Sequence, residues 1–476
     1  MHYQIQVPNA QPAGMVEVLS PYDGKRAGSV ETIDSAGAGQ ALENMTAVFN
    51  DRRQWLPPYE RMAILERAVR LVQARSESLI DIAIAEGGKP CLDTEIELSR
   101  AIDSIKCCID CIRTERGSEI PMQLTPASMN RLAFTHRAPI GPVVAISAFN
   151  HPLNLIVHQA GPAIASGCPV IIKPARETPL SAFALADIFH EAGLPKAWCQ
   201  PVVVEDLAVA EQLVTDKRVA FFSFIGSAAV GWRLRSKLAP GTRCALEHGG
   251  VAPVIIAEDA NLDKLLPLLA KGGFYHAGQV CVSVQRVYAH RAIARTVAER
   301  LAILAEAMIT GDPASAKTDI GPLIRHSEVD RIESWVNEAL QEKATLMTGG
   351  KRLSDSLYSP TVLLNPSEHS KVSQKEIFGP LICVYEYEAI DDAINRANAL
   401  PYAFQAAIAT QNIDTALYAY THLAASTILV NDHTAFRVDW MPFAGLRESG
   451  YGTGGIPYTY RDMQIEKMAI FHSMAL

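Results

Sequence analysis

The chain lacks a long apolar run and a basic leader segment. No uninterrupted apolar stretch approaches the roughly 20 residues that a helix needs to cross a bilayer. The first residues, MHYQIQVPNAQPAG, contain no basic region followed by an apolar segment, so we expect no signal peptide. These absences predict a cytoplasmic protein that does not bind membranes.

An excess of basic charge is also missing. The formal net charge is -8 and the sequence pI is about 5.9, which gives no electrostatic reason to bind nucleic acid. The nine cysteines are an odd number without a regular framework, and this suits a reducing compartment better than a secreted scaffold. We therefore expect no nucleic-acid partner.

The chain has 476 residues, of which 49% are apolar, and this is long enough for two or three domains. GPVVAISAF, at 141–149, is the kind of near-continuous apolar run that forms a strand buried on both faces. Helix-like and strand-like segments then alternate, which predicts an α/β fold with a parallel, doubly wound sheet. The expected strands are 169–173, 199–204, 220–225 and 245–247, and the expected helices are 153–165, 179–192 and two that start at 207 and 228.

The rest of the chain divides around this region. Residues 1–120 begin irregularly and then become helical, and a second α/β region covers 250–448. The segment 121–139 and the tail from 449 read as separate extended pieces, and the tail ends in a predicted strand with the sequence IEKMAIF. Other expected elements are helices at 61–74, 103–112, 262–272 and 293–308 and strands at 251–257 and 426–430.

Cys281 is the first candidate for chemistry. It stands among small and apolar residues after Gly273 and Gly278, where bare backbone would let a small electrophile approach closely. A thiolate is the natural nucleophile toward an aldehyde carbonyl. The alternative is an inert buried cysteine.

Asn150 and Glu247 each stand at the carboxyl end of a predicted strand, where active sites of open α/β sheets lie. The Asn150 amide is able to donate a hydrogen bond to a developing oxyanion, although a turn asparagine is the alternative. Glu247, followed by two glycines, is a candidate general base for water, and the alternative is a surface carboxylate at a turn.

Lys173 and the turn Gly226-Ser227 are candidates for binding a phosphate-bearing cofactor. Lys173 ends a predicted strand, so its ammonium is either a ligand of ribose or phosphate or a solvated strand end. Gly226 and Ser227 precede a predicted helix, whose N-terminus favours an anion. The glycines at 450, 452 and 454 follow no predicted strand, so we interpret them as a loop.

Cys108 and Cys111 have the spacing of a redox or zinc motif. No second pair of ligands stands near them in the sequence. A helix that packs small sulfur-bearing side chains is the simpler interpretation, and we expect no metal site.

Taken together, the motifs resemble the aldehyde dehydrogenase superfamily over essentially the whole chain. The specific part of the resemblance is an ordered set, and the 34 residues from Glu247 to Cys281 are similar to the family's usual interval. The set comprises FNHP at 149–152, IKP at 172–174, FIGS at 224–227, LEHGG at 246–250, GQVC at 278–281, EIFGP at 376–380 and MPFAG at 441–445.

The resemblance implies a role for each motif. Cys281 would attack the aldehyde to give a thiohemiacetal and then a thioester, Asn150 and the Cys281 N–H would hold the oxyanion, and Glu247 would activate water. NAD or NADP would bind to a Rossmann-type domain, 1–120 with 140–249, beside a catalytic domain, 250–448. The segments 121–139 and 449–476 would form a small β extension that makes a homodimer or homotetramer. The implied cofactor contacts are Ile146, Phe149, Lys173, Arg176, Gly226, Ser227, Glu376 and Phe378.

Three positions depart from the family pattern. Arg176 stands where members that use NAD commonly have a glutamate, and a guanidinium there suits the 2′-phosphate of NADP, unless Arg176 faces solvent and Glu177 takes over. His248 replaces the usual leucine and Ala444 the usual glycine. The sequence therefore favours NADP over NAD.

The positions that match the family's substrate tunnel are unusually polar. Arg437 would meet a carboxylate, phosphonate or hydroxyl of the substrate, and the alternative is an ion pair with Asp439. The prediction is a short aldehyde that is polar or anionic. The tunnel positions are His151, Asn154, His158, Val280, Val282 and Arg437.

Two rival functions use the same fold. A CoA-acylating semialdehyde dehydrogenase usually lacks the water-activating glutamate, whereas Glu247 is present here. A non-catalytic member would have lost the nucleophile or the oxyanion donor, and both Cys281 and Asn150 remain.

Overall fold

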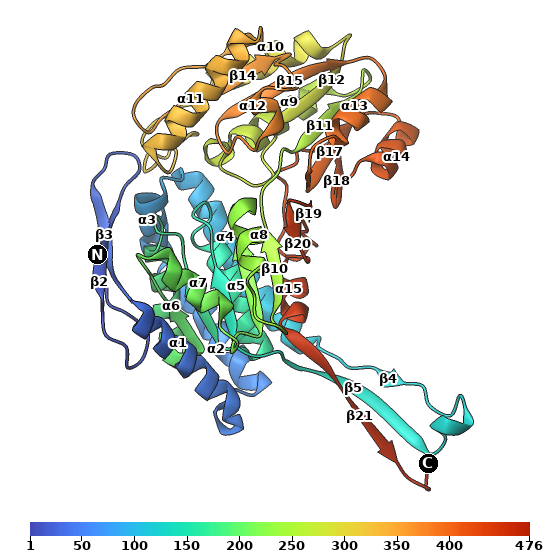
Figure 1. Ribbon diagram of the computed structural model, residues 1–476. Helices are drawn as coiled ribbons and strands as arrows, with labels where there is room; N and C mark the ends of the chain where they lie inside the picture. Colours follow the sequence, from blue (N-terminus) through green and yellow to red (C-terminus); the bar gives the residue numbers. More distant parts are fainter.

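The computed structural model describes residues 1–476 and places them in two α/β domains with a projecting arm (Figure 1). The expected α/β fold is confirmed. In Figure 1 the elements from β11 to α14 form the upper domain, and the elements from α1 to α8 gather in the lower one. None of the helices is long and apolar enough to cross a membrane.

The lower domain contains a six-stranded sheet in the order β20-β10-β9-β6-β7-β8. The five strands from β6 to β10 run parallel, and β20 (Gly450–Tyr451) pairs antiparallel with β10 at the edge. The chain passes outward from β6 through β7 to β8 and returns to the other side of β6 as β9. The strand order therefore reverses between β6 and β9, and ligands of such sheets bind at the carboxyl ends beside that point. The strands are β6 (Val143–Ile146), β7 (Val170–Lys173), β8 (Cys199–Pro201), β9 (Phe221–Ile225) and β10 (Arg243–Glu247).

Helices cover both faces of this sheet, because its strands are apolar on both sides. One core joins β6 and β7 to α2, α4, α5 and α6, and a smaller one joins the other face to α1 and α7. Helix α5 is buried along its whole length, which fixes the loop that enters it from β6. The helices are α1 (Ser35–Asn50), α2 (Pro58–Ala74), α3 (Ser76–Gly87), α4 (Cys91–Arg113), α5 (Asn154–Ser166), α6 (Leu180–Glu191), α7 (Leu207–Thr215) and α8 (Ala228–Arg235).

The upper domain has a seven-stranded sheet in the order β13-β14-β15-β12-β11-β17-β18, with β13 as its only antiparallel strand. A core of 47 buried residues, all between Val254 and Leu429, belongs to this domain. Its strands are β11 (Pro253–Ile256), β12 (Arg286–His290), β13 (Thr345–Thr348), β14 (Thr361–Leu364), β15 (Leu381–Tyr387), β17 (Gln405–Ala409) and β18 (Thr427–Val430). Its helices are α9 (Leu262–Phe274), α10 (Ala294–Glu306), α11 (His326–Gln341), α12 (Lys371–Gln374), α13 (Ile390–Asn398) and α14 (Ile413–His422).

The arm is a three-stranded antiparallel sheet, β21-β5-β4, that projects away from both domains and carries the C-terminus near its tip (Figure 1). Strand β5 (Arg131–Pro139) pairs with β21 (Gln464–His472) over nine residues, and β4 (Glu119–Ile120) joins at one edge. The rings of Phe134 and Phe471 stack across the pair, yet both remain largely exposed. The arm therefore presents an uncovered apolar surface.

Two predictions about the ends of the chain are wrong. The first 32 residues are not irregular: β1 (His2–Tyr3), β2 (Gly14–Leu19) and β3 (Arg26–Thr32) form a sheet, in which Val16 and Val18 alternate with exposed residues. The tail is not extended throughout either, because helix α15 (Ile456–Asp462) buries Ile456 and Tyr460 against the lower domain. The remaining short strands are β16 (Tyr402–Ala403) and β19 (Leu446–Arg447), which pair with each other.

Candidate active site

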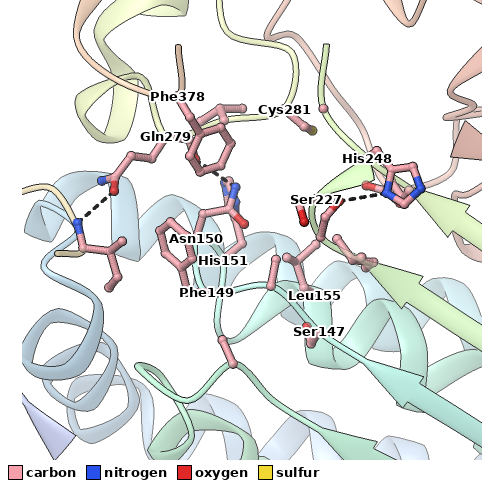
Figure 2. A pocket seen from close by; sticks show the side chains of 18 of the residues that line it. Ser147, Phe149, Asn150, His151, Leu155, Ser227, His248, Gln279, Cys281 and Phe378 are labelled. Carbon is pink, nitrogen blue, oxygen red and sulfur yellow. Dashed lines mark hydrogen bonds between the residues drawn. The ribbon is translucent and has the colours of Figure 1, made fainter. Parts of the chain in front are cut away.

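A cavity of about 590 Å³ opens at the carboxyl ends of β6 and β9 and is lined by residues of both domains. In Figure 2, Cys281 and Gln279 approach it from one side, and Asn150, His151 and Ser227 face them from the other. The tertiary structure thus brings most of the candidate residues together. Those that line the cavity are Ile146, Phe149, Asn150, His151, Asn154, Gly226, Ser227, Glu247, Val280, Cys281, Val282, Glu376, Phe378 and Arg437.

Three candidates lie outside the cavity wall. His158 is buried one turn behind Asn154 on α5. Lys173 ends β7, and its ammonium donates a hydrogen bond to the carbonyl of Pro174 at 3.2 Å. Arg176 is exposed and makes no ion pair, whereas the neighbouring Glu177 lines the cavity and is bound by Arg325.

The nucleophile follows an unusual turn. His276, Ala277 and Gly278 have φ values of 49°, 53° and 70°, which is the left-handed region that costs a residue with a Cβ about 1 kcal/mol or more. A partly buried carboxylate supports the turn, because Asp93 accepts a hydrogen bond from the His276 N–H at 3.2 Å. The strain is thus maintained next to Cys281 by contacts from α4.

The two glycines near Cys281 serve packing, and the expectation that they open the backbone to a substrate is wrong. A Cβ on Gly278 would collide with the carbonyl group of Gly379, and one on Gly273 would lie 2.5 Å from the Ile382 side chain. Both positions are therefore filled by protein atoms.

The Cys281 thiol lies in a region where burial raises its pKa well above the ordinary value, and the negative charge of Glu247 raises it further. The positive charge of Arg437 opposes this shift. A small apolar cluster of Val280, Val282 and Phe443 packs beside the thiol and accounts for the desolvation.

Asn150 is held by a hydrogen bond that its amide donates to the carbonyl of Gln279 at 2.9 Å (Figure 2). An amide has two N–H donors, so one remains for a ligand. The loop around Asn150 is fixed from below, because the Glu97 carboxylate accepts the N–H groups of Leu153 and Asn154 at 2.8 and 2.9 Å.

Glu247 is mostly buried and forms an ion pair with Arg437, at 3.2 Å between Oε1 and a guanidinium nitrogen. The same guanidinium lies 3.6 Å from the centre of the Phe443 ring and 3.3 Å from Nδ1 of His158. The candidate base and the candidate anion-binding residue therefore contact each other directly.

The alternative ion pair between Arg437 and Asp439 is wrong. Asp439 is bound by both guanidinium arms of Arg100, at 2.7 and 3.1 Å, and by Nε2 of His158 at 2.7 Å. Although burial acts in the opposite direction, the hydrogen bonds from His158 and Arg100 hold the pKa of Asp439 below its usual range. Burial and the charge of Arg437 lower the pKa of His158.

Glu376 and Phe378 line the same cavity. Burial raises the pKa of Glu376 to about 8, and its Oε1 atom has no hydrogen-bond partner. The ring of Phe378 meets the ring of Phe149 edge to face at 5.8 Å. A Cβ on Gly249 would collide with the Glu376 carboxylate, so glycine at 249 makes room for it.

His248, a departure from the family pattern, directly follows β10 and contacts the turn before α8. Its Nδ1 atom lies 2.8 Å from the Gly226 carbonyl (Figure 2). Its ring packs against the rings of Phe224 and Trp232. A side chain on Gly231 would collide with this ring. The histidine thus braces the turn that presents Gly226 and Ser227.

Cys108 and Cys111, the pair with the redox or zinc spacing, have different surroundings on α4. Cys108 is fully buried in the core, and a Cβ on Gly161 would lie 2.9 Å from its sulfur. Cys111 is partly exposed and lies beside Cys107, one turn away on the same helix. No group of three or more His, Cys, Asp or Glu side chains is arranged to hold a metal ion.

Several residues of the cavity were missed by the sequence reading. Arg100 and Gln279 matter most, because Arg100 fixes Asp439, and the Gln279 side chain accepts the Ile324 N–H at 3.0 Å while its backbone carbonyl binds Asn150. Gln279 stood inside the quoted GQVC motif, whereas nothing near Arg100 in the sequence signalled a site. Other such residues are Tyr275, Arg325, Arg331, Trp335 and Phe443.

Comparison with known proteins finds relatives over nearly the whole chain. Over 460 residues the chain is 35% identical to a 3-sulfolactaldehyde dehydrogenase of Priestia aryabhattai, covering 97% of this chain and 95% of that protein. A lactaldehyde dehydrogenase of Methanococcus vannielii is 31% identical and covers 96% of this chain and 97% of its own length.

Solved structures match over the whole fold. The structure of aldehyde dehydrogenase 21 from Physcomitrella patens, in complex with the reaction product succinate, has a TM-score of 0.95 and 31% identity, covering 99% of this chain and 98% of that one. The glyceraldehyde-3-phosphate dehydrogenase GapN of Methanocaldococcus jannaschii, complexed with NADP, has a TM-score of 0.91 and 31% identity, covering 97% and 100%.

The sequence model of the aldehyde dehydrogenase family matches residues 7–468. The chain therefore belongs to the aldehyde dehydrogenase family, whose members oxidise aldehydes with NAD(P).

Proposed function

We propose that this enzyme oxidises a short aldehyde with an anionic group to the carboxylic acid, through a covalent intermediate on Cys281. The observation that carries the proposal is one cavity in which Cys281, Asn150 and Glu247 lie together with two partly buried arginines, Arg437 and Arg100. The first three residues supply the chemistry of acyl transfer, and the arginines supply charge for a substrate anion.

The reaction follows from what each group is able to do. The Cys281 sulfur bonds to the aldehyde carbon, and the negative charge on oxygen is met by the Asn150 amide and the Cys281 N–H. Loss of hydride leaves a thioester on Cys281. Glu247 then takes a proton from water, the water oxygen attacks the thioester carbon, and the sulfur leaves as the acid is released.

The cavity suits a nicotinamide cofactor beside Glu376 and Phe378. The unpartnered Oε1 atom of Glu376 is an acceptor that ribose hydroxyls would satisfy. Phe378 and Phe149 would bound the nicotinamide ring, and Gly226 with Ser227 at the start of α8 would face the pyrophosphate. When bound, NAD(P) accepts the hydride. Ile146 and Lys173 complete the proposed set.

NADP is the proposed cofactor in preference to NAD. The position of Arg176 carries no carboxylate to repel a 2′-phosphate, and the carboxylate of Glu177 is neutralised by Arg325. Arg176→Glu should shift the ratio of kcat/KM values toward NAD. An unchanged ratio would remove Arg176 from the proposal.

The proposed anion is a carboxylate, sulfonate or phosphonate close to the aldehyde. The Nε atom of Arg437 is buried without a partner, so it offers a donor inside the cavity wall. The names of the relatives, which include 3-sulfolactaldehyde and aspartate-semialdehyde dehydrogenases, are consistent with short substrates of this class. His151, Asn154, Val280 and Val282 would surround the rest of the substrate, and His158 would support Arg437 from behind.

The test is the formation of reduced nicotinamide from NAD and NADP in parallel, without CoA. The aldehydes would be glycolaldehyde, lactaldehyde, succinic semialdehyde, 3-sulfolactaldehyde, phosphonoacetaldehyde and a long alkyl aldehyde. We expect turnover of an anionic aldehyde that is abolished in Cys281→Ala. Turnover only after CoA is added would favour the acylating alternative, and none under any condition would favour a non-catalytic member.

We also propose a role for each part of the chain. Residues 1–120 with 140–249 bind the cofactor, and residues 250–448 carry the catalytic cysteine. The segments 121–139 and 449–476 join copies of the chain into a dimer or tetramer. The exposed apolar residues of the arm support the last point. Light scattering of the wild-type chain and of Phe134→Lys would test it, because the charge should lower the assembly state.

A further inference from the structure

Arg437 is held by fewer polar contacts than the other arginine of the cavity, Arg100. One is the ion pair with Glu247 at 3.2 Å, and the other is the contact with His158 at 3.3 Å, while Nε has no partner. The neighbouring Arg100 is bound by both of its arms to Asp439 at 2.7 and 3.1 Å. Arg437 is therefore the less firmly held of the two cations that line the cavity.

The ion pair with Arg437 holds the candidate base, Glu247, in the enzyme without substrate. The Glu247 and Arg437 side chains are only 14% and 10% exposed, so their attraction is poorly screened by solvent. The Oε1 atom of Glu247 accepts a hydrogen bond from the guanidinium, so it is not free to accept a proton from water. For Glu247 to activate water well, the contact with Arg437 has to weaken.

We propose that the substrate's own anionic group operates this contact as a switch. In the resting enzyme Arg437 holds Glu247, and when the anion of the bound acyl chain engages the guanidinium, the carboxylate is released to activate water for hydrolysis of the Cys281 thioester. This inference rests on the proposed function. It adds that the anion accelerates the hydrolytic step as well as improving binding.

The geometry favours Arg437 as the moving part. His158 is fixed by Asp439 at 2.7 Å on its other nitrogen, so it remains in place as Arg437 turns. The Phe443 ring, 3.6 Å from the guanidinium, gives a face along which the planar group is able to rotate. Arg437 and Glu247 line the same cavity as Cys281, so an acyl chain on the sulfur reaches the space between them.

The hydrolytic step is measurable without cofactor. p-Nitrophenyl acetate acylates a reactive cysteine, the bond from carbonyl carbon to sulfur forms, and p-nitrophenolate leaves in a burst. The steady rate that follows reports hydrolysis: Glu247 takes a proton from water, the oxygen bonds to the acetyl carbon, and the Cys281 sulfur departs. The acetyl group has no anion, so an added anion is free to occupy the vacant part of the cavity.

The experiment measures the steady rate with increasing propionate or ethanesulfonate at constant ionic strength, with propionamide as the neutral control. We expect both anions to raise the wild-type rate saturably, on the order of ten-fold, which is a part of the roughly 10²–10⁴-fold that general-base catalysis contributes. Arg437→Gln should hydrolyse the acetyl enzyme faster than the unstimulated wild type and show no response. Arg300→Gln, which removes one arginine of an exposed ion pair with Asp263, should respond as the wild type does.

Two results would overturn the switch. One is a wild-type burst followed by a steady rate that the anions leave unchanged or lower, and the other is stimulation that persists in Arg437→Gln. Arg437→Lys keeps the charge and guards against a folding defect in the glutamine variant; it should retain part of the stimulation. A wild-type chain without any burst would contradict the assignment of Cys281 itself, and that failure of the proposed function is distinct from failure of the switch.

Discussion

The carboxylate of Asp93 accepts a hydrogen bond from the backbone N–H of His276 at 3.2 Å, although 183 residues separate them in the chain. His276 begins the three left-handed residues that lead to Gln279 and Cys281. A side chain of the cofactor-side helix α4 therefore supports the backbone that presents the nucleophile. The relationship makes Asp93 a positioning residue, and its removal has a measurable consequence.

Asp93→Ala should lower kcat by about ten-fold, because a strained turn that loses its acceptor relaxes away from the productive geometry. The iodoacetamide reaction of Cys281 should slow in parallel. Asp93→Asn retains an oxygen acceptor and should recover most of the loss. Equal defects in the alanine and asparagine variants would mean that the charge, and not the hydrogen bond, is required.

A buried ion pair joins Lys89, just before α4, to Glu97 on that helix and supports the loop that carries Asn150. Lys89 and Glu97 are almost completely buried, and Glu97 also receives the two N–H groups at the start of α5. Glu97→Gln leaves the Lys89 charge without its partner, so we expect a loss of roughly 3–5 kcal/mol in the free energy of unfolding. The double variant Lys89→Met/Glu97→Gln should recover part of this loss. Urea denaturation of all three variants measures both effects, and additive losses would show that the pair is not coupled.

The reactivity of Cys281 should respond in opposite directions to its two charged neighbours. Glu247 raises the pKa of the thiol and Arg437 lowers it, both in addition to the dominant effect of burial. Glu247→Gln should therefore increase the rate of alkylation by iodoacetamide at pH 8, and Arg437→Gln should decrease it. Profiles of rate against pH for both variants give the two shifts, and shifts of the same sign would contradict the electrostatic assignment.

Cofactor binding should release protons through Glu376. Burial raises its pKa from the model-compound value of 4.5 to about 8, so the side chain is mainly protonated at pH 7. Ribose hydroxyls that donate to the carboxylate favour the charged form, so binding lowers the pKa and affinity should rise as pH increases from about 6 to 8. Calorimetry at pH 7 in two buffers of different ionisation enthalpy measures the released proton. Glu376→Gln should show none, and a wild-type enthalpy that is independent of buffer would exclude this role.

The same raised pKa has a consequence for stability without cofactor. The contribution of Glu376 is fully present below 4.5 and is lost as pH rises through about 8, because the folded state binds the proton more tightly than the unfolded chain does. Thermal unfolding between pH 5 and 9 should therefore show a decline in the wild type that is smaller in Glu376→Gln. Parallel curves would mean that Glu376 does not titrate in this window.

The sequence by itself determined the fold class and 14 of the 34 residues that line the cavity. Apolar runs such as 141–149 report strands buried on both faces, and Asn150 and Glu247 follow such runs, so their place at one edge of the sheet follows from the topology of parallel sheets. The ordered motifs were specific enough to indicate the family. Short edge strands at 2–32 and the helix after Gly455 were missed, because two to seven residues carry little periodicity.

Only the tertiary structure decided which charged groups meet. Arg437 was expected to pair either with a substrate or with Asp439, two residues away; it contacts Glu247, 190 residues earlier in the chain, and Asp439 instead binds Arg100 and His158. Local spacing reports which residues share a face of one element, whereas the partner of a long, flexible arginine depends on how separate elements pack around a cavity. The residue types therefore indicated the chemistry of this site, whereas the contact between Arg437 and Glu247 was found only in the tertiary structure.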